Sequence, residues 1–237
     1  MEEITVNGIV LKSINYKEKD KIINIFTVEL GNVSAILKGV SSAKAKMKFA
    51  WQPFCFAKFD LVKSNNYYVV KSVELIDTFF DLSLDYDNYL YGSSFLEVCN
   101  HILKPNIISE NLFLLLLKTL KNIVYNDVDG LISAIKFYIE FLNIIGYKLN
   151  FDNCDLCGMK FLGDIKFNYH TGSFRCSNCS DDMPLSKQLF SSIKIIATTD
   201  IEKIKTLKLN KECLKECLNM LIKNVSDKIN FKIKSFS

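Results

Sequence analysis

The hydrophobic periodicity of this 237-residue chain changes near Asp77, and that change constrains its fold more than any other feature. Before it, apolar residues recur with a period of two, which is typical of strands. After it they recur with a period of 3.6, which is typical of helices. The sequence therefore predicts an α+β multidomain chain. The strand-like stretches are Val6–Leu11, Ile22–Thr27, Val33–Leu37, Phe54–Val62 and Tyr67–Val73.

Five strands within residues 6–73 favour a small β-barrel, because closing the sheet removes edges that so short a domain cannot otherwise cover. Residues 29–32 and 64–66 separate neighbouring strands and contain Gly or Asn. Both residue types tolerate the positive φ of tight hairpin turns. We expect a hairpin at each position.

The helical part contains clear start and stop signals. The first helix ends before Pro105, because proline cannot continue a helix. The third begins at an N-cap, Asp129, and ends at Gly146, a natural left-handed C-cap. A basic end from residue 228 onward is expected to be ragged. The predicted helices cover residues 85–103, 109–125 and 129–146, one that starts at Ser186, and one that starts near Asn210.

Two C-x2-C pairs, Cys154 with Cys157 and Cys176 with Cys179, are separated by 18 residues. This spacing lets each pair supply one edge of a tetrahedral site while the intervening residues form a hairpin. Four thiolates leave no position for water or substrate, so the expected cofactor is a structural Zn²⁺ ion. The sequence predicts that the metal stabilises this segment without taking part in catalysis.

Two alternatives for these cysteines stay open: four unligated thiols, or a thioredoxin-like redox pair. A disulfide framework is disfavoured, because the chain is long and has no export signal. His170 is interpreted as a surface residue of the hairpin, although it is able to replace one thiolate. The other four cysteines are interpreted as small apolar residues of the core, namely Cys55, Cys99, Cys213 and Cys217.

The formal net charge is +4, and the positive charge lies at the two ends of the chain. Residues 1–72 have a net charge of +5, residues 73–150 of −5, and residues 151–237 of +4. All basic residues except Arg175 are lysines, which act as mobile point charges and are poorly suited to reading a guanine edge. If nucleic acid binds, the phosphate backbone is the expected target.

A basic loop follows the third predicted strand and contains no acidic residue. Its four lysines are Lys38, Lys44, Lys46 and Lys48, which we predict to contact a phosphate backbone. The alternative is a solvated loop. The loop after the first strand is mixed in sign, so Tyr16, Lys17 and Lys19 are weaker candidates, with Tyr16 as a stacking face. Arg175, next to a predicted metal ligand, is a further possible DNA contact or an ordinary surface residue.

Signatures of catalysis are missing from the sequence. It has no phosphate-binding glycine loop and no H-x-E motif beside the cysteines. Its two histidines, His101 and His170, fall in different predicted elements. The longest apolar run has six residues, far below the roughly 20 needed to cross a bilayer. We expect a cytoplasmic, nucleoid-associated protein that is not an enzyme and does not enter a membrane.

Taken in order, these features resemble the RecO family of DNA repair and recombination proteins. The resemblance is carried by residues 8–12, by Phe26-Thr27 with Gly31, by residues 38–40 and 52–54, by the two cysteine pairs, and by residues 233–235. It covers nearly the whole chain. The basic loop departs from the family pattern, which mixes Arg with Lys, and His170-Thr171-Gly172 stands where a glycine pair is common.

The resemblance implies an oligonucleotide/oligosaccharide-binding (OB) fold followed by a helical domain with an inserted zinc module. The expected divisions are 1–80, 81–150, 151–183 and 184–237. It further implies a recombination mediator that binds single-stranded and double-stranded DNA, anneals complementary strands and helps to load RecA on DNA coated with single-stranded-DNA-binding protein. RecR, RecF and that coating protein are the implied partners.

Two other functions stay open at this point. A zinc-stapled module that binds only proteins would show no salt-sensitive DNA binding. A hydrolase that uses exposed carboxylates would cleave an oligonucleotide when magnesium is added.

Overall fold

The computed structural model describes residues 3–42, 47–64, 67–105 and 107–236. It divides into two compact units. The barrel unit comprises the residues up to Leu114 together with Lys234–Phe236, and the helical unit comprises Leu115–Ile233. Helix α2 (Glu110–Tyr125) begins in the first unit and continues into the second. The domain divisions expected at residues 80, 150 and 183 stay predictions.

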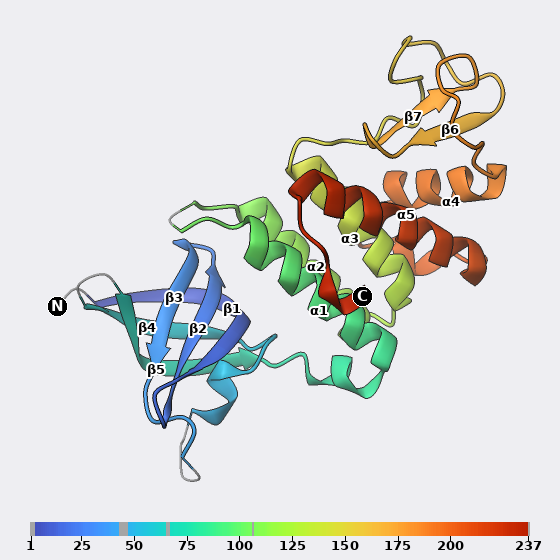
Figure 1. The fold of residues 1–237 in the computed structure, drawn as a ribbon. Coiled ribbons are helices and arrows are strands. Elements are labelled where there is room, and N and C mark those ends of the chain that lie inside the picture. The colour runs from blue at the N-terminus through green and yellow to red at the C-terminus, as the bar shows by residue number, and fades with distance from the viewer. Residues whose placement is uncertain (1–2, 43–46, 65–66, 106, 237) are drawn as a thin grey trace. The chain divides into compact units, whose positions relative to one another are not determined.

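The first part of the chain forms the predicted closed five-stranded barrel (Figure 1). Its strand order is β1-β2-β3-β5-β4, with β4 closing on β1. Only β3 and β5 are parallel, over a short register that pairs Ala35 with Tyr68. The OB-type barrel expected from the sequence is confirmed. The strands are β1 Glu3–Tyr16, β2 Asp20–Thr27, β3 Gly31–Leu37, β4 Phe56–Ser64 and β5 Tyr67–Asp77.

Several strands are longer than their apolar stretches, because backbone pairing continues where side chains are exposed. In β1, pairing with β4 extends back to Glu3 and pairing with β2 extends forward to Tyr16. In contrast, β4 starts two residues later than predicted. Phe54 has a φ of +70°, and the amide of Cys55 donates to the carbonyl of Gln52, so the chain turns there before the strand begins.

The interior of the barrel is filled by alternate residues of all five strands. Phe59, Ile23 and Val10 are fully buried in it. The segment that follows the basic loop also contributes, since Ala50 of the 3-10 helix η1 (Lys48–Trp51) is fully buried. Phe49 and Trp51 pack against the same core. The return from the basic loop is therefore anchored by apolar packing.

Helix α1 (Tyr86–Ile102) completes the barrel unit. It follows the 3-10 helix η2 (Phe80–Leu84), and the side chain of Asp85 accepts a hydrogen bond from the amide of Asn88 as its N-cap. Gly92 gives room to Phe54, because a Cβ on it would lie 3.0 Å from the Phe54 ring. The side-chain amide of Asn24 in β2 also donates to Asn100, at 3.0 Å. These contacts tie the first helix to the barrel.

The helical unit is built around helix α3 (Gly130–Ile144), most of whose residues are buried. Asp129 caps its start and Gly146, at φ +89°, follows its end, as the sequence predicts. Lys136 is only 4% exposed, and its ammonium donates to the carbonyl of Ala197 and pairs with Glu140. The helices are α2 Glu110–Tyr125, α3 Gly130–Ile144, α4 Lys187–Thr198 and α5 Lys211–Ile229, with η3 at Ile204–Thr206.

Between α3 and α4 the chain forms a small module on a two-stranded hairpin, β6 (Ile165–Asn168) and β7 (Ser173–Cys176). Phe167 and Phe174 are buried beneath it, with ring centroids 5.2 Å apart. Phe174 also contacts Phe190 of α4, edge to face at 5.1 Å. Aromatic packing therefore fixes the hairpin on the helical unit.

The expectation of a ragged basic end is wrong. Helix α5 ends at Ile229 and is capped by Asn230, which adopts a left-handed conformation, and Ile233 is buried. The 3-10 helix η4 (Lys234–Phe236) belongs to the barrel unit and packs on α1. There the carboxylate of Glu97 accepts hydrogen bonds from the Lys234 amide at 2.7 Å and the Ser235 hydroxyl at 2.6 Å.

None of the helices in the described ranges combines the length and the apolar character needed to cross a bilayer.

Candidate metal centre and nucleic-acid interface

The first cysteine pair lies on a tight turn that the backbone builds by itself. The amide of Gly158 donates to the carbonyl of Cys154 at 2.9 Å, and the amide of Cys154 donates to the carbonyl of Met159 at 2.8 Å. Gly158 has a φ of +72°, which glycine adopts without strain. The second pair begins at the end of β7, where the Cys179 amide donates to the Cys176 carbonyl at 3.0 Å.

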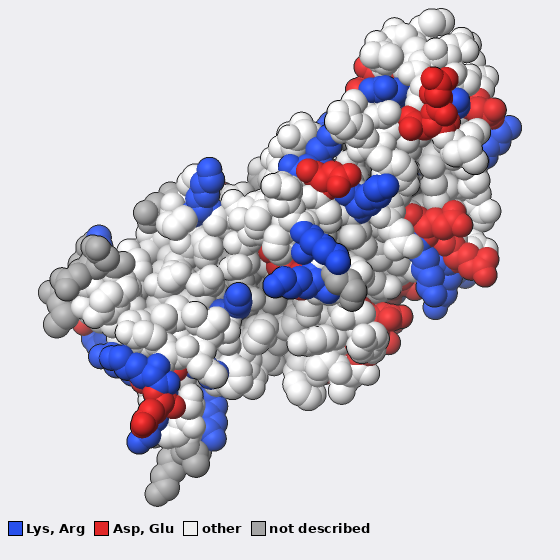
Figure 2. All heavy atoms as spheres, in the orientation of Figure 1, with Lys and Arg blue, Asp and Glu red and all other residues white. Residues whose placement is uncertain are grey.

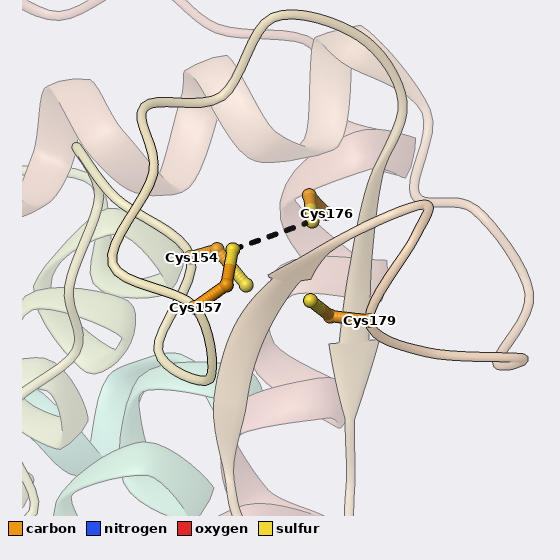
Figure 3. Close-up of side chains that lie close together, drawn as sticks. All are labelled: Cys154, Cys157, Cys176 and Cys179. Carbon is orange, nitrogen blue, oxygen red and sulfur yellow. Dashed lines mark hydrogen bonds between the residues drawn. The ribbon is translucent and has the colours of Figure 1, made fainter.

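These two turns bring the four sulfur atoms together, and all of them lie within 4.8 Å of one another. Figure 3 shows the side chains of both pairs pointing toward one another. Sulfurs bound to one ion at about 2.3 Å in a tetrahedron are separated by about 3.8 Å. The Cys157 and Cys176 sulfurs are 3.9 Å apart. The residues present therefore fit a tetrahedral metal ion.

Even without a metal ion, the thiols of the cluster differ in their pKa values. Burial raises the pKa of Cys154, but hydrogen bonds from backbone amides, first that of Cys157, outweigh burial and lower this pKa to about 6. The neighbouring sulfurs of Cys176 and Cys157 raise the pKa of Cys179 to about 12. Several thiolates so close together repel one another, and a divalent cation removes that repulsion.

His170 and the four cysteines outside the two pairs lie where the sequence predicts. His170 is exposed at the hairpin turn, and the cluster of metal-compatible groups in the described residues does not include it. Burial raises the pKa of the Cys55 thiol to about 12, as expected for a small core residue. The remaining three cysteines outside the cluster are buried too, at positions 99, 213 and 217.

Helix α5 holds the turn of the same hairpin. The Lys228 ammonium donates to the carbonyl of Thr171 at 2.7 Å and to that of His170 at 3.4 Å. Five residues earlier in α5, the Lys223 ammonium lies 4.2 Å from the centroid of the Tyr169 ring. The far end of the metal module is thus fastened to α5 by charged side chains.

The basic loop begins at the end of β3 and is attached to the loop between β1 and β2. The amide of Gly39 donates to the Asp20 carboxylate at 2.8 Å, and the amide of Ser41 donates to the carbonyl of Lys19 at 3.1 Å. Val40 is buried in the barrel core. The start of the loop is therefore a fixed turn.

The structure places Lys38 and Lys48 at the two ends of this loop, both exposed. Within the part of the chain that the structure describes, neither forms an ion pair. Lys44 and Lys46 lie outside the described residues. Figure 2 shows lysines, with some acidic residues among them, gathered at the lower end of the barrel, where both loops lie.

The residues predicted as weaker candidates for DNA contact lie in two different parts of the structure. Lys17 and Lys19 are exposed in the β1–β2 loop, and the Lys17 ammonium lies 5.3 Å from the centroid of the partly buried Tyr16 ring. Arg175 belongs to the other unit, on β7, where its guanidinium donates to the Thr171 hydroxyl at 3.1 Å. Its Nε is buried without a hydrogen-bond partner among the described atoms. Arg175 therefore lies on the metal module, in a different unit from the lysines.

Trp51, also at this end of the barrel, is not among the residues predicted from the sequence. The ammonium of Lys21 lies 4.0 Å from the centroid of its ring. Trp51 is the only tryptophan of the chain and lies three positions after Lys48, the last lysine of the basic loop, and this position was the available signal. Its proximity to Lys21, thirty positions earlier, is a property of the folded barrel.

Comparison with known proteins covers both units. The family model described as Recombination protein O N terminal matches residues 1–79, and the model described as Recombination protein O C terminal matches residues 83–235. Three similar proteins carry the name DNA repair protein RecO. Those from Caldicellulosiruptor saccharolyticus and Thermoanaerobacter sp. are each 30% identical over 100% of this chain and 98% and 97% of their own lengths. The one from Clostridium novyi is 29% identical over 96% of this chain and 90% of its own length.

Proposed function

The chain belongs to the RecO family of recombination and DNA repair proteins, and from this premise we propose that it is a non-catalytic recombination mediator. In this proposal it binds single-stranded and double-stranded DNA through the phosphate backbone. It anneals complementary strands and assists the loading of RecA on DNA coated with single-stranded-DNA-binding protein. RecR and RecF are its further proposed partners.

The observation that carries this proposal is the joining of two lysine-bearing loops at one end of the barrel. The Ser41-to-Lys19 hydrogen bond brings Lys17, Lys19 and Lys38 to the same region as the exposed Lys48. Lysines without acidic partners attract regularly spaced phosphates and release the counterions that surround them. Lys44 and Lys46 belong to the same loop and are proposed contacts on sequence grounds alone.

Annealing follows from the same electrostatics. A cationic surface that holds two strands lowers their mutual repulsion and raises their local concentration. Lysine contacts are point charges without a fixed hydrogen-bonding plane, so a bound strand is able to slide until its bases find their partners. No step of this mechanism requires a covalent reaction.

We further propose that Cys154, Cys157, Cys176 and Cys179 bind one Zn²⁺ ion. With four sulfur ligands the ion has no open coordination position, so its role is to stabilise the module. Thiolate ligands favour zinc over magnesium or calcium, which prefer oxygen. Aromatic packing of the hairpin and its attachment to α5 then connect that stabilisation to the rest of the helical unit.

The proposal is tested by fluorescence anisotropy with a labelled single strand and a labelled duplex at several salt concentrations. Each lysine that neutralises one phosphate contributes about 0.7 to the log–log salt slope for a single strand. Replacing Lys38, Lys44, Lys46 and Lys48 with Gln should therefore lower the slope by about 3. The matched control replaces Lys58 and Lys71, which pair with Glu74 and Glu3 on the barrel wall.

If the log–log salt slope of the loop variant equals that of the wild type, the four lysines of the basic loop do not contact DNA. If the wild-type chain binds neither DNA even at low salt concentration, the proposed DNA-binding function is wrong. Incubation of the labelled strand with magnesium tests the non-catalytic part of the proposal. Cleavage would contradict it.

One observation favours a second candidate function, protein binding by the metal module. Four large apolar side chains on this module are 62% to 90% exposed. Large apolar side chains that are this exposed mark a protein contact where they form one continuous surface. In this alternative the module binds a partner protein while the barrel does not bind DNA. The side chains are those of Leu156, Met159, Leu162 and Met183.

A further inference from the structure

The ring of Trp51 lies between the barrel core and an ammonium group. It is partly buried and packs against the core residues. The Lys21 ammonium is 4.0 Å from the ring centroid and also donates to the side-chain oxygen of Asn15, at 2.7 Å. The indole is therefore fixed by apolar packing, while the charge over it is held by two weak, replaceable contacts.

Further lysines lie close to this pair in the sequence. Lys21 lies at the start of β2, two positions after Lys19 of the β1–β2 loop, and Lys48 lies three positions before Trp51 in η1. The hydrogen bond from the Ser41 amide to the Lys19 carbonyl joins the basic loop to the β1–β2 loop, two positions before Lys21. Of the two acidic residues in the β1–β2 loop region, Asp20 accepts from the Gly39 amide and Glu18 is exposed. An aromatic ring with one ammonium group over it, and with further lysines in the adjoining turn and 3-10 helix, suits a ligand that combines flat rings with phosphates.

We propose that Trp51 is a stacking platform for one unpaired base of a single-stranded nucleic acid. The Lys21 ammonium then leaves the ring and pairs with a backbone phosphate of the same strand. This inference rests on the proposed DNA-binding function and adds to it a residue and a strand preference. The base replaces a weak cation–π contact with a stack, and the ammonium exchanges the ring for a full negative charge.

The proposal predicts selectivity for strand type without selectivity for sequence. Every base has a π-face, so any unpaired base is able to stack on the indole. In a duplex the faces of the bases are already stacked on their neighbours, and only the phosphates remain available. Trp51 should therefore contribute to single-strand affinity and leave duplex affinity unchanged, whereas the lysines contribute to both.

A purely structural role makes a different prediction. If Trp51 and Lys21 only close the end of the barrel, replacing the indole lowers the melting temperature and changes affinity for both forms of DNA to the same extent. The two roles therefore differ in the ratio of single-strand to duplex affinity. That ratio does not depend on the fraction of the protein that is folded.

The experiment uses the full chain with an oligothymidylate and a duplex of the same length. Because Trp51 is the only tryptophan, its emission reports this site directly, and we expect the single strand to quench it strongly and the duplex weakly. Trp51→Leu should weaken single-strand binding roughly 5- to 100-fold at a constant salt slope. Trp51→Phe, which keeps an aromatic ring, should fall between the wild type and Trp51→Leu.

The control variant replaces Lys38 and Lys48 with Gln. It should weaken both forms of DNA and lower the single-strand salt slope by about 1.4. Binding of the single strand with unchanged tryptophan emission would overturn the stacking proposal and leave the proposed function intact. An equal loss for both forms of DNA in Trp51→Leu would do the same. No binding of either DNA by the wild type would refute both.

Discussion

Gly172 and Asn224 approach each other so closely that the hairpin turn tolerates no side chain at position 172. A Cβ built there would lie 2.2 Å from Oδ1 of Asn224, which is fully buried in α5. Gly172 also has a φ of +67°, in the left-handed region. Sterics and backbone conformation thus require glycine at the same point where the metal module meets α5.

Gly172→Ala should therefore destabilise the helical unit. The left-handed conformation costs about 1–2 kcal/mol for a residue with a Cβ, and the clash with Asn224 adds about 1–3 kcal/mol. Urea unfolding followed by circular dichroism measures the sum. Gly163→Ala is the matched control in the same module, because its Cβ meets no atom within 4 Å, and it should change stability by less than about 1 kcal/mol. Equal stability of the two variants would contradict the packing argument.

Lys228→Met should loosen the hairpin turn without unfolding the unit. The variant loses the donor to the carbonyls of Thr171 and His170, but both residues are exposed, so water replaces the ammonium. The expected loss is at most about 1 kcal/mol. Amide hydrogen exchange at residues 171 and 172 should become faster. Lys215→Met, an exposed position on the same helix, should leave that exchange unchanged. Faster exchange in both variants would point to α5 as a whole.

Cys176→Ser should abolish binding of one equivalent of zinc and lower the melting temperature. The hydroxyl is a poor zinc ligand, and the three remaining thiolates no longer complete the tetrahedron. Metal analysis of the purified protein measures the stoichiometry. Cys217→Ala is the control, since this thiol is fully buried outside the cluster and its loss affects only packing and a weak hydrogen bond to the carbonyl of Leu189. A variant that keeps its zinc and its stability would refute the assignment of Cys176 as a ligand.

Asp60→Asn should make the barrel less sensitive to acid. The hydroxyl of Ser72 and then that of Thr5, at 2.7 Å, hold the pKa of Asp60 below its ordinary value of 3.8. The unfolded chain therefore binds this proton more readily than the folded one. The stabilisation is present above pH 3.8 and is lost as the pH falls through the folded-state pKa.

Unfolding at several pH values, followed by the emission of Trp51 in the barrel, measures this effect. In the wild type the free energy of unfolding should fall more steeply below pH 4 than in Asp60→Asn. Curves that run parallel would show that the two hydroxyl groups do not favour the charged form.

Much of the architecture was predictable because its signals are local. The change of period at Asp77 separates barrel from helices, and Asp129, Ser186 and Asn210 each cap the helix that the sequence predicts after them. The spacing of the cysteine pairs predicted four sulfurs in one cluster, which the structure confirms. Periodicity, capping and short turns depend on neighbouring residues, so they can be read from the chain itself.

Other features depend on contacts between residues far apart in the chain, and the tertiary structure alone decided them. Lys21 meets Trp51 because β2 and η1 converge at one end of a closed barrel. Residues 234–236 look like a solvated basic end, yet Glu97 accepts two of their hydrogen bonds. The need for glycine at position 172 arises from Asn224 on another element. Such pairings follow from how whole elements pack against each other, and no local pattern of residue types encodes them.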